Sequence, residues 1–285
     1  AALETRLTQA RAVLREEGRE LHAKALHDCA GGTTFEITLE GGTHGEMRDL
    51  LDRYLQPVAA LVSDAGFAVP QIFVSDMDST MIGQECIDEL ADFAGLKHQI
   101  ATITERAMQG ELDFEQALRE RVMLLRDLAE DAILECLNTR IKPMAGAPTL
   151  VATLKSKGCR TVLVTGGFHQ FADPVAEWLG FDRVVGNRLA VANGALTGGL
   201  IGPITDSSVK KEVLLDEAGQ VGGGAVSLAT GDGANDIPML EAATYGMAYH
   251  AKPKARAAAN GYIDAGDLTA ILCLLGIPEA EWVTP

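Results

Sequence analysis

Strand-like runs alternate with helical patterns over most of the chain, and this alternation restricts the possible fold more than any other feature. The runs, several of them wholly apolar, lie at 72–75, 161–164, 183–185, 225–229 and 246–249. Helical patterns lie between them at 149–157, 170–179, 209–218 and 237–243. Continuously apolar strands are covered on both faces, and strand–helix–strand repeats give parallel strands. The sequence therefore predicts an α/β fold with a doubly wound parallel sheet.

One long helical stretch interrupts this alternation between the first two strands. A crossover between parallel strands needs only about a dozen residues, so the surplus at 85–142 predicts a helical cap inserted over the strand ends. The core then consists of 70–84 and 143–285. Within it, Asn193-Gly194 between two short runs predicts a β-hairpin, and Gly158, Gly180 and Gly219 stand where helix C-caps belong.

Residues 1–69 have a different pattern and predict a separate small α+β domain. Helical spacing at both ends flanks an alternating run at 34–39 that is typical of a strand, and Pro57 is expected to break the second helix. Nothing in this region suggests chemistry.

Composition excludes several classes of partner. A net charge of −16 argues against nucleic acid and anionic membranes. No run approaches the roughly 18 apolar residues of a membrane span, and the first residues lack the apolar core of a signal peptide. Five scattered cysteines without a Cys-x-x-Cys pair predict reduced, buried thiols in the cytoplasm, at Cys29, Cys86, Cys136, Cys159 and Cys273.

Two carboxylates, Asp76 and Asp78, directly follow the first strand. Two unit charges about 4 Å apart repel by roughly 4 kcal/mol at an effective dielectric constant of about 20. A shared proton, a cationic side chain or a metal ion must offset this repulsion. An isolated Asp-x-Asp pair is usually a solvated turn, so the segments that follow decide its interpretation.

Three further segments are expected at the same edge of the sheet. Thr165-Gly166-Gly167 ends a strand and offers a hydroxyl and backbone N–H groups to an anion. Lys210 lies early in a helix and supplies a compact cation. The third, Gly231-Asp232-Gly233-Ala234-Asn235-Asp236, is not a dinucleotide loop, because the carboxylate of Asp236 would repel a pyrophosphate. Oxygen ligands without His or Cys favour Mg²⁺, and the set suits phosphoryl transfer through an aspartyl-phosphate.

These four segments, in this order, resemble the motifs of the haloacid dehalogenase-like phosphatases. The likeness is greater to the members that act on phosphoserine, through Glu85, 87–89, 114–119 and 187–189. It covers about 72–275, with Thr165 where serine is common. It does not cover 1–69, where related enzymes often carry an ACT-like regulatory fold and where the pattern here is short or degenerate.

The resemblance implies a role for each acid. Asp76 would attack phosphorus, and Asp78 would protonate the leaving oxygen and later accept a proton from water. Mg²⁺ would be held by the carboxylate of Asp76, the backbone carbonyl of Asp78 and Asp232, with Asp236 supporting its waters.

The resemblance also implies how substrate is bound. Thr165, Gly166, Lys210 and Asn235 would hold the phosphoryl oxygens. In the cap, Glu85 would bind the substrate ammonium, Arg121 its carboxylate, and Phe114 would form part of the lid. Helical periodicity alone instead favours an ion pair of Arg121 with Glu120, and His169 is interpreted as a residue that begins a helix.

The implied activity is hydrolysis of O-phospho-L-serine to L-serine and phosphate, the last step of serine biosynthesis, by a cytoplasmic monomer or homodimer. Three alternatives stay open: a phosphotransferase that passes the group to another alcohol such as homoserine, a phospho-accepting signalling module, and a catalytically silent binding protein.

Overall fold

The computed structural model describes residues 2–29, 31–109 and 111–285. Its main sheet has eight strands in the order β3-β10-β9-β8-β4-β5-β6-β7. The bounds are β3 Ala59–Leu61, β4 Ile72–Ser75, β5 Arg160–Phe168, β6 Arg183–Ala192, β7 Ala195–Ile201, β8 Ser227–Gly231, β9 Tyr245–Tyr249 and β10 Gly261–Ile263. The five central pairings, from β10 through β9, β8, β4 and β5 to β6, are parallel, which confirms the predicted fold class.

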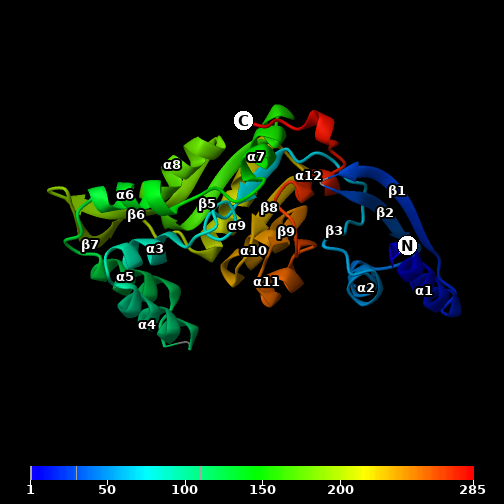
Figure 1. Cartoon of the computed structure of the whole chain (residues 1–285), viewed down its shortest axis with the longest axis horizontal. Helices are drawn as coiled ribbons and strands as arrows, with labels where there is room; N and C mark the ends of the chain where they lie inside the picture. Colours follow the sequence, from blue (N-terminus) through cyan, green and yellow to red (C-terminus); the bar gives the residue numbers. More distant parts are fainter. Residues whose placement is uncertain (1, 30, 110) are drawn as a thin grey trace.

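Helices cover both faces of this sheet, because its strands alternate between two cores. Phe73, Leu163 and Leu228 belong to one core, with α7 (Ala147–Ser156), α8 (His169–Leu179) and α12 (Ala270–Leu274). Val74 and Ala229 belong to the other, with α9 (Ser207–Val221), α10 (Ile237–Ala242) and α11 (Pro253–Ala258). Figure 1 shows these helices above and below the sheet.

The predicted insertion is helical throughout its main elements. It contains α3 (Cys86–Phe93), α4 (Lys97–Met108), α5 (Phe114–Leu124) and α6 (Asp131–Arg140), and it lies at one end of the molecule (Figure 1). The predicted hairpin is confirmed as β6–β7: Ala192 pairs with Ala195, and Asn193 and Gly194 both have positive φ. An isolated antiparallel β-bridge between Ala195 and Ala129 joins this hairpin to the cap.

The N-terminal region forms the other end of the molecule (Figure 1). It contains α1 (Ala2–Glu16), a two-stranded sheet of β1 (Leu21–Cys29) and β2 (Gly32–Leu39), α2 (His44–Leu50) and the π-helix η1 (Leu51–Leu55). The helix ends before Pro57, as predicted. Strand β3, which lies inside 1–69, pairs antiparallel with β10 and so belongs to the main sheet. Arg256 of α11 also forms an ion pair with Asp52.

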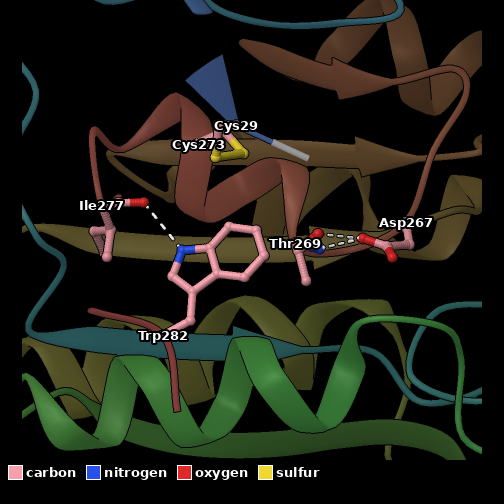
Figure 2. Close-up of a disulfide and its surroundings, with 6 residues drawn as sticks. All are labelled: Cys29, Asp267, Thr269, Cys273, Ile277 and Trp282. Carbon is pink, nitrogen blue, oxygen red and sulfur yellow. Dashed lines mark hydrogen bonds between the residues drawn. A yellow bond between two sulfur atoms is a disulfide. The ribbon is translucent and has the colours of Figure 1, made fainter. Parts of the chain in front are cut away.

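Two of the predicted free thiols are paired, so that prediction was wrong for them. Cys29, at the tip of the β1–β2 hairpin, forms a disulfide with Cys273 of α12 (Figure 2). The two positions are separated by 244 residues in sequence, and local spacing carries no information about such a pair. Cys86, Cys136 and Cys159 are free and buried, as predicted.

A few other expectations changed. Helix α9 continues through Gly219 to Val221, and Gly222, with φ of 122°, takes the C-cap position instead. Gly180 is a left-handed C-cap, as predicted. The short strands β3, at one edge of the sheet, and β10, beside it, were not predicted. None of the helices in the described ranges is both long enough and apolar enough to cross a bilayer.

Candidate active site

Adjacent parallel strands bring the first and last acidic segments together. Strand β4 pairs with β8 so that Ser75 lies opposite Thr230, and the backbone N–H of Asp76 donates to the Thr230 carbonyl at 3.0 Å. Both strands end at the same edge of the sheet. Carboxylate oxygens of Asp76, Asp232 and Asp236 all lie within 4.8 Å of one another. The structure therefore gathers acids that are about 160 residues apart in the sequence.

Lys210 lies between two of these acids. Its Nζ is 2.7 Å from Oδ1 of Asp76 and 2.7 Å from Oδ1 of Asp236, and all three side chains are buried. Burial by itself favours the neutral amine, but the two carboxylates outweigh it and hold the pKa of Lys210 above its usual value. Lys210 is therefore a fixed positive charge at the base of the site.

Protein groups compensate the remaining negative charge only in part, since Nζ of the exposed Lys252 lies 4.0 Å from Oδ2 of Asp232. Burial, followed by repulsion from Asp236, raises the pKa of Asp76 well above its usual value, although Lys210 opposes this. The same two causes raise the pKa of Asp232 to about 6. Three converging carboxylates with one buried lysine fit a divalent cation, which would favour their ionised forms. Asp236 also accepts a hydrogen bond from the backbone N–H of Gly233 at 3.0 Å, so both its oxygens have protein partners.

Asp78 faces the cap and the second motif. Its Oδ1 accepts the backbone N–H of Cys86 at 3.1 Å, at the start of α3. Its Oδ2 lies 2.9 Å from where a Cβ on Gly167 would stand, so only glycine fits there without displacement. Burial, and then the neighbouring Glu85, raise the pKa of Asp78 to about 7. A carboxyl group with such a pKa can both donate and accept a proton near neutral pH.

Strand β5 extends further than predicted, and Thr165, Gly166 and Gly167 lie near its carboxyl end. The buried Thr165 hydroxyl oxygen accepts the Gly167 N–H at 2.8 Å. The ring of Phe114, from the start of α5, lies 3.3 Å from where a Cβ on Gly166 would stand. The cap thus contacts the core directly at the predicted anion cradle.

The cap contributes two charged side chains. Glu85 accepts a hydrogen bond from the Ser79 hydroxyl at 2.8 Å, and Ser79 has a positive φ of 55°, which is uncommon outside glycine. Arg121 donates through Nε to the Ala117 carbonyl at 3.2 Å. Burial lowers its pKa, while the charges of Asp88 and Glu85 oppose this.

The ion pair of Arg121 with Glu120 is not formed. Glu120 instead pairs with Arg106 at 2.7 Å, and within the described ranges no carboxylate lies within ion-pair distance of Arg121. Its two Nη groups are therefore available to an anionic ligand.

The other two candidates lie at the margins. Asn235 is exposed in the short turn at 234–236, next to the acids. His169 begins α8, as interpreted from the sequence, and its Nδ1 is 2.7 Å from Oδ1 of Asp173, one helical turn further on.

Two buried hydroxyl groups beneath the site were not singled out from the sequence. Ser75 donates to the carbonyl of Asp76 at 2.7 Å, and its Oγ is 2.7 Å from Oγ1 of Thr230. Each directly follows apolar residues near the carboxyl end of its strand, and that position is the sequence signal that could have identified them.

Comparison with known proteins agrees with this geometry. The sequence profile described as haloacid dehalogenase-like hydrolase matches residues 73–241, which include Asp76, Thr165, Lys210 and Asp232. This is more than half of the chain. The chain belongs to the haloacid dehalogenase-like hydrolases.

Within this hydrolase family, the chain is similar to proteins named as phosphoserine phosphatases. The phosphoserine phosphatase of Vibrio cholerae is 40% identical over 243 residues, covering 85% of this chain and 74% of that protein. A phosphoserine phosphatase structure described as a phospho-aspartyl intermediate analogue has a TM-score of 0.66 and 38% identity, covering 72% of this chain and 99% of that one.

The structure of a haloacid dehalogenase family hydrolase from Salmonella enterica serovar Typhi matches a larger part of this chain. It has a TM-score of 0.79 at 28% identity, and the match covers 95% of this chain and 94% of that one. This share must include most of the N-terminal region.

Proposed function

We propose that this hydrolase converts O-phospho-L-serine to L-serine and inorganic phosphate through an aspartyl-phosphate on Asp76. The observation that carries the proposal is the position of the Asp76 carboxylate, in contact with Lys210 and at the strand edge where Thr165 and Gly166 lie. The phosphoserine phosphatases among its relatives support the choice of substrate.

Asp76 acts as the nucleophile. One of its oxygens attacks phosphorus, the bond from phosphorus to the serine oxygen breaks, and the phosphoryl group is left on Asp76. Lys210, the Thr165 hydroxyl and the backbone N–H of Gly166 hold the phosphoryl oxygens, with Asn235 beside them. Because Lys210 is already fixed by two carboxylates, it needs little reorganisation when charge develops.

Asp78 moves the protons. In its neutral form it donates a proton to the departing serine oxygen, and as a carboxylate it then accepts a proton from the water that attacks the aspartyl-phosphate. Its pKa of about 7 suits both steps. The second step releases phosphate and restores the Asp76 carboxylate.

The cap selects the substrate. Arg121, whose Nη groups are available, binds the serine carboxylate in a bidentate pair, and Glu85 binds the ammonium group. Phe114, which lies against Gly166, covers the phosphoryl end of the substrate. A monoester without the amino-acid group would lose both charged contacts.

The cation is Mg²⁺ in this proposal, held by the carboxylates of Asp76 and Asp232 and the backbone carbonyl of Asp78, with Asp236 in support. Oxygen-only ligands together with a phosphate group are typical of Mg²⁺ sites. Bound there, the ion supplies positive charge that, with Lys210, offsets the charge on the acids and on the phosphoryl oxygens.

The substitution Asp76→Asn tests the nucleophile. It keeps the shape of the side chain but removes its nucleophilic carboxylate, so phosphate release from L-phosphoserine should fall at least about a thousandfold. Near-unchanged thermal unfolding would show that the fold is kept. Phosphatase activity retained by this variant would contradict the assignment of Asp76.

A panel of monoesters tests the substrate and the cation. Phosphoserine should be hydrolysed with the highest kcat/KM, activity should be lost after dialysis against a chelator, and added Mg²⁺ should restore it. Equal activity on all monoesters, or full activity without a divalent ion, would contradict this part of the proposal.

Transfer of the phosphoryl group to homoserine or another alcohol is not favoured, since the matched relatives are phosphatases. Product analysis with homoserine added separates the two outcomes.

Serine biosynthesis follows from the proposed product. Cytoplasmic location and a monomeric or homodimeric state stay predictions, and the thiol argument for the cytoplasm now rests on Cys86, Cys136 and Cys159 alone.

A further inference from the structure

Asn187 connects two segments that the proposed function assigns to phosphate binding. It lies in β6 next to β5, and its side chain is buried, with the residue only 1% exposed. Its Nδ2 donates to the carbonyl of Gly166 at 2.8 Å and to the carbonyl of Thr205 at 3.3 Å. Its Oδ1 accepts the N–H of Thr205 at 2.8 Å. The polar atoms of this one amide thus connect the end of β5 with the loop before α9.

The contact with Gly166 fixes the peptide that joins Gly166 to Gly167. The N–H of that peptide donates to the Thr165 hydroxyl oxygen at 2.8 Å. Because the hydroxyl oxygen accepts this bond, the hydroxyl hydrogen can donate in another direction. Asn187 therefore determines, through one peptide, how Thr165 presents its hydrogen to an anion.

The contacts with Thr205 fix the start of the helix that carries Lys210. Asp206, the next residue, is the N-cap of α9 and accepts the N–H groups of Ser208 and Val209. Lys210 follows in the first turn. The side chain of Asn187 thus sets the distance between the Thr165–Gly166 cradle and the helix of Lys210, although within the described part of the chain it forms no hydrogen bond with Lys210 or the acids.

We propose that Asn187 is a positioning residue for phosphate binding, which holds the Thr165–Gly166 cradle and the N-terminus of α9 at the separation that a phosphoryl group requires. This rests on the proposed function for the identity of the substrate. The geometry of the cradle can be tested separately with inorganic phosphate.

The chain offers a matched control in Gln170 of α8, which bonds to the same strand. The Gln170 amide makes the same kind of bridge, donating to the Leu189 carbonyl at 2.9 Å and accepting the Leu189 N–H at 3.2 Å. Leu189 is two residues beyond Asn187 along β6, away from the cradle. Gln170→Ala therefore removes a comparable bridge without loosening Gly166 or Thr205.

The experiment measures the Kd of inorganic phosphate by calorimetry with Mg²⁺ present, for wild type, Asn187→Ala, the milder Asn187→Ser and Gln170→Ala. The KM for phosphoserine and the unfolding temperature are measured in parallel. We expect both Asn187 variants to raise the phosphate Kd and the KM by about tenfold or more, and Gln170→Ala to leave both within about twofold, at a similar loss of stability.

An unchanged phosphate Kd in the Asn187 variants would overturn the proposal, as would an equal rise in Gln170→Ala. Failure of both Asn187 variants to fold would also overturn it, because Asn187 would then serve the fold as a whole. If wild type binds phosphate but does not hydrolyse phosphoserine, the proposed function fails while the Kd comparison still decides the role of Asn187.

Discussion

At the scale of single residues, the site is organised by charges that cannot be considered one at a time. Lys210 is buried between Asp76 and Asp236, and Asp236 is also held by the Gly233 N–H. Removing Lys210 would leave two buried carboxylates without the cation they share, which is costly in a protein interior. Arg121 is the opposite case, because it is held by one backbone carbonyl and its Nη groups are unpaired among the described residues.

The substitution Arg121→Ala should separate substrate recognition from chemistry. We expect the KM for phosphoserine to rise about 10- to 100-fold, because a charged hydrogen-bonded pair is lost. The KM for a small aryl phosphate, which has no carboxylate to bind, should change little. Arg119→Ala is a suitable control, since Arg119 pairs with Glu115 on the exposed side of the same helix. Equal effects on both substrates would exclude Arg121 from the substrate pocket.

At the scale of elements, α9 delivers Lys210 to the acids from the loop after β7. Its first turn is fixed by Asp206, whose Oδ1 accepts the Ser208 hydroxyl at 2.7 Å and the backbone N–H groups of Ser208 and Val209. The Ser208 hydroxyl and these N–H groups hold the pKa of Asp206 below its usual value. Helix α9, which carries Lys210, is therefore capped by a side chain that titrates.

The substitution Asp206→Ala should lower the free energy of unfolding by about 1 kcal/mol at neutral pH. Since the pKa of Asp206 is lowered in the folded protein, its stabilising contribution is complete above the unfolded value of about 3.9 and is lost as the pH falls through the lower folded value. Asp206→Asn is the control, because asparagine also caps helices but does not titrate. Denaturant unfolding at pH 7 and pH 3 measures the effect; an equal loss for both variants at pH 7 would contradict it.

At the scale of the whole molecule, the disulfide joins the N-terminal hairpin to the catalytic core. Cys29 and Cys273 both line a cleft of about 1160 Å³ between β2 and the core, and none of the candidate site residues lines that cleft. Near the disulfide, the Trp282 indole N–H donates to the Ile277 carbonyl at 3.0 Å and Thr269 bonds to Asp267 (Figure 2). The hairpin is thus fixed to a part of the core that is remote from the acids.

Reduction of this disulfide should weaken the fold but not the chemistry. We expect a reductant, or the double substitution Cys29→Ser with Cys273→Ser, to lower the free energy of unfolding by about 2–4 kcal/mol. The kcat for phosphoserine should stay within about twofold. The double variant should show no response to reductant, which is the internal control. Five titratable thiols in wild type unfolded without reductant would show that the disulfide is not formed.

The sequence by itself determined the features that depend on residues close together along the chain. The period of the apolar runs predicted the parallel sheet and the cap, Asn193-Gly194 predicted the hairpin, and the order of Asp76, Thr165, Lys210 and Asp232 predicted an acidic site, because turn chemistry and strand alternation are local properties. The short strands β3 and β10 were missed, since three residues carry too little periodicity.

Only the tertiary structure decided which distant groups meet. Cys29 pairs with Cys273, and Glu120 forms its ion pair with Arg106 rather than Arg121. Asn187 lies between Gly166 and Thr205. These contacts depend on how separate elements pack against one another. Local spacing along the chain does not specify that packing, and so the residues that position the site emerge only from the folded molecule.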